Sequence, residues 1–260
     1  MLALDLDGTV LTADLKLDPR DVEALDRARA AGVFVVAVTG RPFPGALPWV
    51  ERMHLPGPIV CYQGAQIRGL DGEMMLDHGV DHEVAAEVIR FARERDLHVQ
   101  TYSDDRLLVE RDRPEAHEYS EHAGMPINLV GDLAQATGPT TPKVVIVAAK
   151  AVIENLLPEI RTRFRGRLNA ATSMPTYLEM TSPRADKRLA LEHLCGLLGI
   201  TAEQAVAVGD GRNDIPMIEW AGLGVAVEGA AAEVMKSASQ VVARPGEAGI
   251  ARLVNELLHS

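Results

Sequence analysis

The chain begins with MLALDLDGTVLT, residues 1–12, an apolar strand interrupted by two acids. Side chains two residues apart in a strand face the same way, so Asp5 and Asp7 bring two negative charges together where this strand ends. Gly8 then allows the backbone to turn close to a ligand. A pair of solvated acids in a loop fits these residues, and so does a cation site that includes a nucleophile. The stretch alone leaves both interpretations open.

The segments on either side of the chain's middle alternate short apolar strands with helical patterns. A helix is expected from Asp18-Pro19 to Gly32, because Asp is a cap residue and Pro favours the first helical position. The other expected elements are strands at 33–38, 58–62, 205–210, 223–227 and 240–243, and helices over about 185–198 and 213–221. Continuous apolar runs are typical of strands buried on both faces of a parallel sheet. We therefore predict an α/β fold, a doubly wound and mostly parallel sheet built from both ends of the chain.

The middle of the chain has a different pattern. HVQTYS, RLLVER, KVVIVAA and TYLEMT alternate polar with apolar residues, and two amphipathic helices lie near 82–95 and 151–165. This pattern favours an antiparallel sheet with one solvated face and helices on the other. We predict a catalytic core of residues 1–80 and 183–260 and an inserted α+β cap domain of residues 81–182. Two chain crossings between them would permit a hinge.

Composition and charge argue against several classes of protein. With 260 residues, 47% hydrophobic, the chain can bury a sizeable core. A formal net charge of -11 disfavours nucleic acid and anionic membranes as partners. Cys61 and Cys195 are too isolated for a disulfide framework or a zinc site. The sequence shows no membrane-spanning run and no signal peptide, which predicts a cytoplasmic protein, either a monomer or a small homo-oligomer. Only four residues precede Asp5, so the first strand is short or the true start lies upstream.

A second group of acids follows a later strand. In VAVGDGRND, residues 206–214, Asp210 comes directly after an apolar run, and Asn213 and Asp214 lie where the next helix would start. Acids at the carboxyl ends of neighbouring parallel strands would provide the hard oxygen ligands that magnesium prefers. Taken alone, the segment fits a turn followed by a helix cap equally well.

Two further positions offer groups that bind anions. VTGR, residues 38–41, follows the second strand and offers the Thr39 hydroxyl, the Gly40 amide and the Arg41 guanidinium, although an ordinary strand-to-helix turn would also explain it. Lys187 begins the 185–198 helix, and a lone lysine is by default a surface residue. Its charge is unfavourable at a helix N-terminus, which favours a role in holding an anion.

Together, DLDGT (5–9), TGR (39–41), Lys187 and GDGRND (209–214), in this order and at these strand ends, closely resemble the haloacid dehalogenase (HAD) superfamily of phosphatases. The resemblance covers about 1–80 and 183–260 and implies a HAD-like Rossmannoid core. The length and pattern of the insert resemble the large α/β cap of the Cof-type branch. Members of that branch mostly hydrolyse sugar phosphates and other small phosphomonoesters.

The resemblance implies a role for each acid. Asp5 attacks phosphorus to form an aspartyl phosphate, while Asp7 protonates the leaving oxygen and later activates the hydrolytic water. Mg²⁺ is held by the Asp5 carboxylate, the Asp7 backbone carbonyl and Asp210, and Asp214 orients these groups. It offsets the repulsion between a carboxylate nucleophile and a phosphate dianion.

The resemblance also implies which groups bind the substrate. Thr39, the Gly40 amide, Lys187 and Asn213 bind the phosphoryl oxygens, and Arg41 points towards the cap. The expected substrate is a small phosphorylated metabolite.

Several positions depart from the pattern of the branch. Gln63 stands where Asn is usual, and we predict that it lies, like Arg41, at the substrate or cap interface. VAVEGA (225–230) replaces the common Met-Gly-Asn-Ala. Arg184 and Arg188 replace glycines around Lys187; simple solvation explains both, and our hypothesis is that one of them favours a substrate with a second anionic group. Glu179 on the last cap strand could face the substrate, although a Leu-Glu-Met strand is more often half-buried.

Alternatives from other classes remain. A phosphomutase would use the same residues and return the phosphoryl group to its substrate. A non-catalytic phospho-aspartate signalling switch also gathers acids, Thr and Lys on such a sheet, but it lacks the second Asp two residues on and needs no inserted domain. A dinucleotide-binding enzyme is disfavoured, because no strand is followed by a full G-x-G-x-x-G and no P-loop occurs.

Overall fold

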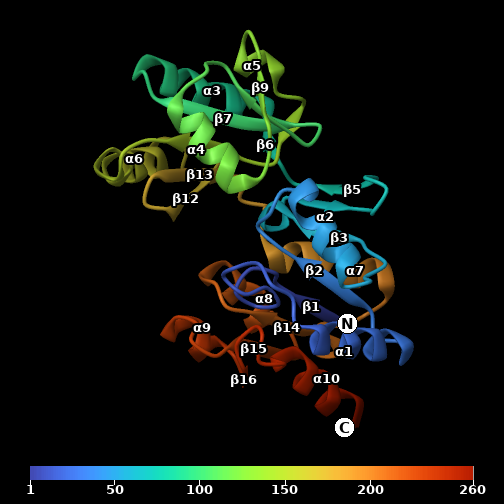
Figure 1. The fold of residues 1–260 in the computed structure, drawn as a ribbon. Coiled ribbons are helices and arrows are strands. Elements are labelled where there is room, and N and C mark those ends of the chain that lie inside the picture. The colour runs from blue at the N-terminus through green and yellow to red at the C-terminus, as the bar shows by residue number, and fades with distance from the viewer. Residues whose placement is uncertain (260) are drawn as a thin grey trace. The chain divides into compact units, whose positions relative to one another are not determined.

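The structure is a computed structural model that describes residues 1–259. Contacts between Cα atoms divide it into two compact units, whose elements are labelled in Figure 1. The core unit comprises Met1–Arg41, Ala46–Leu76 and the chain from Asp186 onward. The inserted unit comprises Pro42–Gly45 and Asp77–Ala185, so the segment predicted as a cap, 81–182, lies within it. A role for this unit as a substrate-covering cap remains a prediction.

The core unit is built on an eight-stranded sheet in the order β16-β15-β14-β1-β2-β3-β4-β5. Six neighbouring strands pair in parallel: β16 (Gln240–Val242), β15 (Leu223–Val227), β14 (Val206–Gly209), β1 (Leu2–Leu4), β2 (Val35–Val38) and β3 (Ile59–Cys61). Strand β4 (Gln66–Arg68) is antiparallel to β3, and β5 (Met74–Asp77) follows at the edge. Leu2 pairs with both Val206 and Val35, which places the acid-bearing strand in the middle of the sheet.

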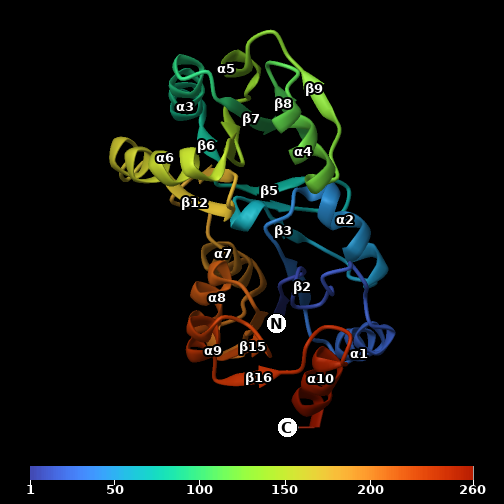
Figure 2. The same ribbon diagram turned by 60° about the vertical axis from the view of Figure 1, so that its left-hand side comes forward.

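Helices cover both faces of this sheet (Figure 2). On one face α7 (Lys187–Leu198) and α8 (Ile215–Trp220) bury Leu191, Leu194 and Met217 against Ala3 and Val36. On the other, α1 (Pro19–Ala30) and α10 (Gly249–His259) pack together. Helix α2 (Phe43–Arg52) follows β2. The remaining helix of this unit is α9 (Ala232–Ser237), and short 3-10 turns occupy Tyr62–Gly64, Ala202–Gln204 and Arg212–Asp214. Cys61 and Cys195 are both buried, and within residues 1–259 neither forms a disulfide.

Local sequence signals explain where the key helices begin. The Asp18 side chain accepts from the Arg20 amide, and Pro19 opens α1. Asp186 caps α7 by accepting from the amides of Arg188 and Leu189, and Gly199 ends that helix in the left-handed conformation. Lys187 is thereby held as the first residue of its helix.

The inserted unit has a six-stranded sheet in the order β12-β13-β11-β7-β8-β9. Its strands are β7 (His98–Ser103), β8 (Arg106–Val109), β9 (Ile127–Leu129), β11 (Val144–Val147), β12 (Asn169–Met174) and β13 (Tyr177–Thr181), and all neighbours are antiparallel except β8 and β9. A small ladder joins β6 (Val80–Asp81) to β10 (Thr140–Thr141). Its helices are α3 (His82–Glu94), α4 (Pro114–Ala123), α5 (Leu133–Ala136) and α6 (Lys150–Arg163).

The predicted solvated face of this second sheet is exposed at one edge strand and buried at the centre of the sheet. Helices α3 and α6 bury one face around Phe91, Ile146 and Phe164, as expected. On the other face, Gln100 and Lys143 are buried near the centre of the sheet, whereas Asn169 on the edge strand β12 is exposed. Helix α4 contacts β7 and β11 there, and the hydroxyls of its Tyr119 and of Tyr102 lie 2.5 Å apart. At the centre of this sheet, the polar alternation therefore marks a buried face and not an aqueous surface.

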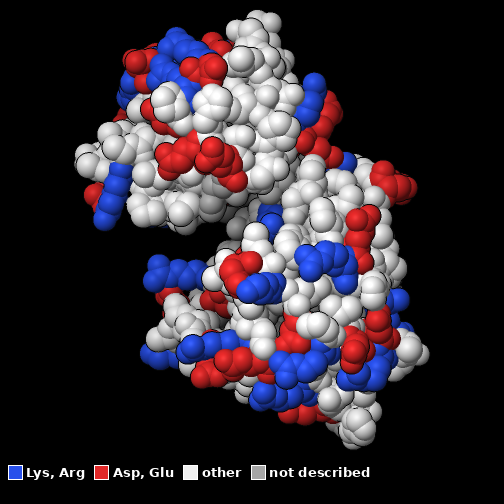
Figure 3. Space-filling model, viewed as in Figure 1, with Lys and Arg blue, Asp and Glu red and all other residues white. Residues whose placement is uncertain are grey.

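Two observations concern the prediction that nucleic acid and membranes are disfavoured as partners: the distribution of surface charge and the lengths of the helices. On the face shown in Figure 3, acidic and basic side chains are interspersed. Among residues 1–259, no helix is long and apolar enough to cross a membrane.

Candidate active site

Three neighbouring strands end at one edge of the core sheet and carry the predicted groups. Asp5 follows β1, Thr39 follows β2 and Asp210 follows β14. The Asp5 amide donates to the Val208 carbonyl at 3.0 Å, so β1 stays joined to β14 up to the acid. Because parallel strands present their carboxyl ends at the same edge, residues about 200 positions apart come together here.

The carboxylates of Asp5, Asp210 and Asp214 form a compact cluster, in which one oxygen of each lies within 4.8 Å of the others. Asp5 is 5% exposed and Asp214 is 1% exposed. The Thr9 hydroxyl donates to Asp210 Oδ1 at 3.1 Å. Gly8 has a φ of 81°, and a Cβ added there would lie 2.3 Å from Asp210 Oδ2, so only glycine allows this approach.

Lys187 bridges two of these acids. Its Nζ donates to Asp5 Oδ1 and to Asp214 Oδ1, both at 2.6 Å, and the residue is 1% exposed. Burial acts to lower the pKa of Lys187, but the charges of Asp214 and Asp5 outweigh it, so the pKa is raised and the ammonium form is held. The anions that Lys187 contacts in this structure are carboxylates of the chain itself.

The two carboxylate oxygens of Asp5 have different surroundings. Asp5 Oδ1 is held by Lys187, whereas Oδ2 has no hydrogen-bond partner among the described residues. The two oxygens of Asp214 are both engaged, because Oδ1 accepts from Lys187 and Oδ2 accepts from the amides of Asp210 and Gly211 at 3.1 and 2.9 Å. Asp214 therefore shapes the loop that carries Asp210.

The cluster carries more negative than positive charge. Burial raises the pKa of Asp5 to about 7, with Lys187 opposing this effect and Asp214 adding to it. Burial, together with the charge of Asp214, also raises the pKa of Asp210. Three carboxylates face one ammonium, and all the donors are hard oxygens, which is the set of groups that suits a divalent cation such as Mg²⁺. The residues present therefore fit the predicted metal.

Asp7 is placed differently from the other acids. Its side chain is 50% exposed and pairs with Arg41, whose Nε and Nη2 donate to the two carboxylate oxygens at 2.7 and 2.5 Å. The Arg41 amide in turn donates to Thr39 Oγ1 at 3.1 Å. The Asp7 carboxylate is thus held beside the buried cluster by a bidentate ion pair that sequence reasoning did not anticipate.

Asn213 and Gln63 meet at the same edge. Asn213 Nδ2 donates to Gln63 Oε1 at 2.7 Å, across 150 positions of the chain. The Gln63 side-chain amide packs directly on Gly40, where an added Cβ would lie 2.4 Å from Nε2. The sequence predicted Gln63 as a residue of the substrate or cap interface, but no local signal linked it to Asn213.

The remaining predicted residues, Arg184, Arg188 and Glu179, make contacts of their own. Arg188 pairs with Glu192 on the same helix at 2.7 Å, in a partly exposed position. Arg184 and Glu179 belong to the inserted unit. Glu179 pairs with Lys143 at 3.1 Å, with side chains only 14% and 7% exposed. Lys143 is a buried charge that the strand pattern KVVIVAA did not reveal.

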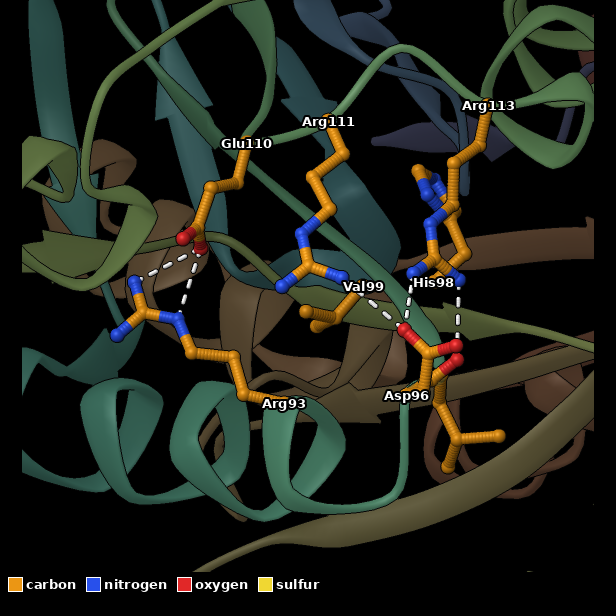
Figure 4. A pocket seen from close by; sticks show the side chains of 8 residues that line it. Arg93, Asp96, His98, Val99, Glu110, Arg111 and Arg113 are labelled. Atoms are coloured by element: carbon orange, nitrogen blue, oxygen red, sulfur yellow. Dashed lines mark hydrogen bonds and ion pairs between the residues drawn. The ribbon is translucent and has the colours of Figure 1, made fainter.

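The inserted unit also holds a small charged pocket of about 20 Å³, seen in Figure 4. That volume has room for about one water molecule. Arg93 pairs with Glu110 and Asp132, while Arg111 and Arg113 both pair with Asp96. Because three arginines face three carboxylates, the pocket is an ion-pair network that joins the end of α3 to the segment after β8.

Comparison with known proteins places this geometry in a family. The family model of haloacid dehalogenase-like hydrolases matches residues 2–254. The chain belongs to this family. Pyridoxal phosphate phosphatase YbhA of Escherichia coli is 28% identical over 93% of this chain and 92% of its own length. The 5-amino-6-(5-phospho-D-ribitylamino)uracil phosphatase YitU of Bacillus subtilis is 25% identical over 98% of this chain and 96% of its own length.

A solved structure gives the same result for the fold. A haloacid dehalogenase-like hydrolase from Bacteroides thetaiotaomicron superposes with a TM-score of 0.90, at 29% identity and over 98% of both chains. The predicted family, the fold class and the prediction of an enzyme are confirmed. The family and the names of these relatives support a phosphoric monoester hydrolase.

Proposed function

We propose that this hydrolase is a Mg²⁺-dependent phosphatase of small phosphomonoesters that works through an aspartyl phosphate on Asp5. The observation that carries the proposal is the state of the Asp5 carboxylate. Lys187 holds Oδ1 at 2.6 Å and leaves Oδ2 without a hydrogen bond to the described residues. A carboxylate oriented by one oxygen, with the other available, is suited to in-line attack on phosphorus.

The chemistry divides into two displacements. In the first, Asp5 Oδ2 attacks phosphorus, the P–O bond to the alcohol breaks, and Asp7 gives its proton to the leaving oxygen. In the second, water attacks the same phosphorus, Asp7 takes its proton, and inorganic phosphate leaves Asp5 free again. Asp7 is half-exposed and lies two residues from Asp5, so a change of rotamer can bring it from Arg41 to the reacting oxygens.

The surrounding groups bind charge. Mg²⁺ would be held by the Asp5 carboxylate, the Asp7 backbone carbonyl and Asp210, and when bound it neutralises part of the phosphate charge. Asp214 supports this arrangement through its contacts with Lys187 and with the loop amides. Thr39, the Gly40 amide and Asn213 lie at the same sheet edge and would take the phosphoryl oxygens.

The substrate class is proposed more broadly than a single compound. YitU and YbhA are named for a phosphorylated ribitylamino compound and for pyridoxal phosphate, two different small phosphomonoesters. We propose small phosphorylated metabolites, sugar phosphates among them. The inserted unit of residues 77–185 would act as the cap that selects among them and excludes bulk water.

The test is the release of inorganic phosphate from p-nitrophenyl phosphate with Mg²⁺ present. Asp5→Asn keeps the size of the side chain and should lower kcat by roughly 10³-fold or more, because it removes the nucleophile. Asp14→Asn is the matched control, since Asp14 is a solvent-exposed acid paired with Lys16. Activity that survives Asp5→Asn, or that persists undiminished after all divalent metal is removed, would contradict the proposal. Return of the phosphoryl group to substrate in place of free phosphate would indicate a mutase.

A further inference from the structure

The turn after β3 contacts three segments of the site. The Gln63 amide donates to the Thr39 carbonyl at 3.0 Å, and the Tyr62 amide donates to the Arg41 carbonyl at 2.9 Å. A Cβ added to Gly64 would lie 2.3 Å from the Asp186 carbonyl, at the start of the helix that carries Lys187. The third segment is the loop after β14, which Gln63 reaches through Asn213.

Gln63 adopts an unfavourable backbone conformation to reach this position. Its φ and ψ are 61° and 28°, in the left-handed region that non-glycine residues other than Asn and Asp rarely occupy. Such conformations cost on the order of 1 kcal/mol and persist where surrounding contacts impose them, often at functional sites. The backbone at Gln63 is therefore held in this conformation by its neighbours.

The two ends of the Gln63 side chain have different surroundings. Oε1 accepts from Asn213 Nδ2 at 2.7 Å. Asn213 Oδ1 lies against Gly211, where an added Cβ would be 2.3 Å away, so the Asn213 amide is confined as well. Nε2 lies over Gly40 and has no hydrogen-bond partner among the described residues. A partly buried donor is thus aimed at the loop that carries the Gly40 amide.

We propose that Gln63 is a further phosphoryl-binding residue, whose Nε2 donates to the phosphoryl oxygen bound at Gly40 while its Oε1 orients Asn213. The inference rests on the proposed function and adds a donor to that site. One side chain would then link two groups that bind the anion, Gly40 after β2 and Asn213 after β14. Because Oε1 is engaged by Asn213, Nε2 is the end that faces the anion.

The experiment measures inhibition by orthovanadate and by inorganic phosphate during p-nitrophenyl phosphate hydrolysis with Mg²⁺. Gln63→Met keeps the length of the side chain and removes both hydrogen-bonding ends. It should weaken both inhibitors roughly 10- to 100-fold, the range expected for a lost hydrogen bond to a charged group. Gln63→Glu keeps the acceptor for Asn213 but replaces the donor by a charge that repels the anion, so it should weaken inhibition at least as much.

A double-variant comparison separates direct binding from positioning. If Nε2 contacts the anion, Gln63→Met should still weaken vanadate inhibition about 10-fold when Asn213 is already Ala. If Gln63 acts only through Asn213, the double variant should match Asn213→Ala alone. The proposal is overturned if adding Gln63→Met to Asn213→Ala weakens vanadate inhibition by less than about threefold.

Controls keep this result distinct from other failures. Gln135→Glu makes the same charge change at an exposed residue of α5 and should leave both inhibition constants unchanged. Thermal unfolding of each variant shows whether the fold is retained, and Gln63→Glu provides a second test if Gln63→Met does not fold. If the wild type is active, Asp5→Asn is inactive and vanadate inhibition is unchanged in both Gln63 variants, this inference is wrong and the proposed phosphatase function stands. A wild type without activity or vanadate binding would overturn both.

Discussion

Replacing Lys187 by Met should destabilise the metal-free protein strongly, although no substrate is involved. The ammonium makes two contacts of 2.6 Å with Asp5 and Asp214, and all three groups are at least nine-tenths buried. At an effective dielectric constant of about 20, each such contact corresponds to roughly 6 kcal/mol of Coulomb energy, much of which is offset by the cost of burying the charges. Removing one partner of a buried pair costs about 3–5 kcal/mol, because the other charges are left uncompensated.

The measurement is urea-induced unfolding at pH 7.5 with a chelator present, read by circular dichroism. We expect the free energy of unfolding of Lys187→Met to fall by about 3–5 kcal/mol and phosphatase activity to be lost. The matched control is Arg188→Gln on the next residue of α7, which removes the same charge from a partly exposed pair with Glu192. That change should cost no more than about 0.5 kcal/mol. Equal effects of the two substitutions, or a loss below about 1 kcal/mol for Lys187→Met, would refute the reasoning.

Three further predictions concern other groups. Asp210→Asn should raise the Mg²⁺ concentration needed for half-maximal activity roughly 10-fold or more, and unchanged metal dependence would contradict this. The same substitution should raise the free energy of unfolding of the metal-free protein by about 0.5–2 kcal/mol, because it relieves repulsion between like charges. Arg188→Ala should lower activity most for phosphate esters with a second anionic group, and an unchanged ranking across a panel of esters would exclude that role. Burial raises the pKa of Asp21 from 3.8 to about 6, so the folded chain holds this proton more tightly than the unfolded chain, and the resulting stability is present below pH 3.8 and lost as pH rises through 6. The stability advantage of Asp21→Asn over the wild type should therefore grow as pH rises from 4 to 7. It should level off at about 1–2 kcal/mol, because the Ala251 amide of α10 donates to Asp21 Oδ1 at 2.8 Å and favours the charged form. An advantage that does not vary with pH would refute this reasoning.

Much of the core unit could be predicted from short stretches of sequence. Asp18-Pro19 marks the start of α1, and apolar runs mark the parallel strands, because caps and periodicity act over a few residues. The acids after β1 and β14 could be expected at one sheet edge for the same reason, since the parallel order dictates where strands end. The unfavourable place of Lys187 at a helix N-terminus indicated an anion, and the structure shows that Asp5 and Asp214 are the anions it contacts.

The local pattern was insufficient wherever burial depends on a distant partner. The alternation in HVQTYS indicates one polar face, but α4 covers that face, and Gln100 is buried there. A polar residue at every second position looks the same in the sequence whether its face meets water or a helix. The pairing of Lys143 with Glu179 escapes the sequence for the same reason.

The sequence by itself determined the element order, the family and the chemical types at the strand ends, because these follow from propensity, periodicity and motif spacing. Only the tertiary structure decided which side chains share a contact. Asp7 pairs with Arg41, and Asn213 reaches Gln63 across 150 positions, through turns whose positions are set by packing on both sides of the sheet. A side-chain hydrogen bond requires agreement to within a few tenths of an ångström, and that precision arises from the packed fold and not from any local stretch of chain.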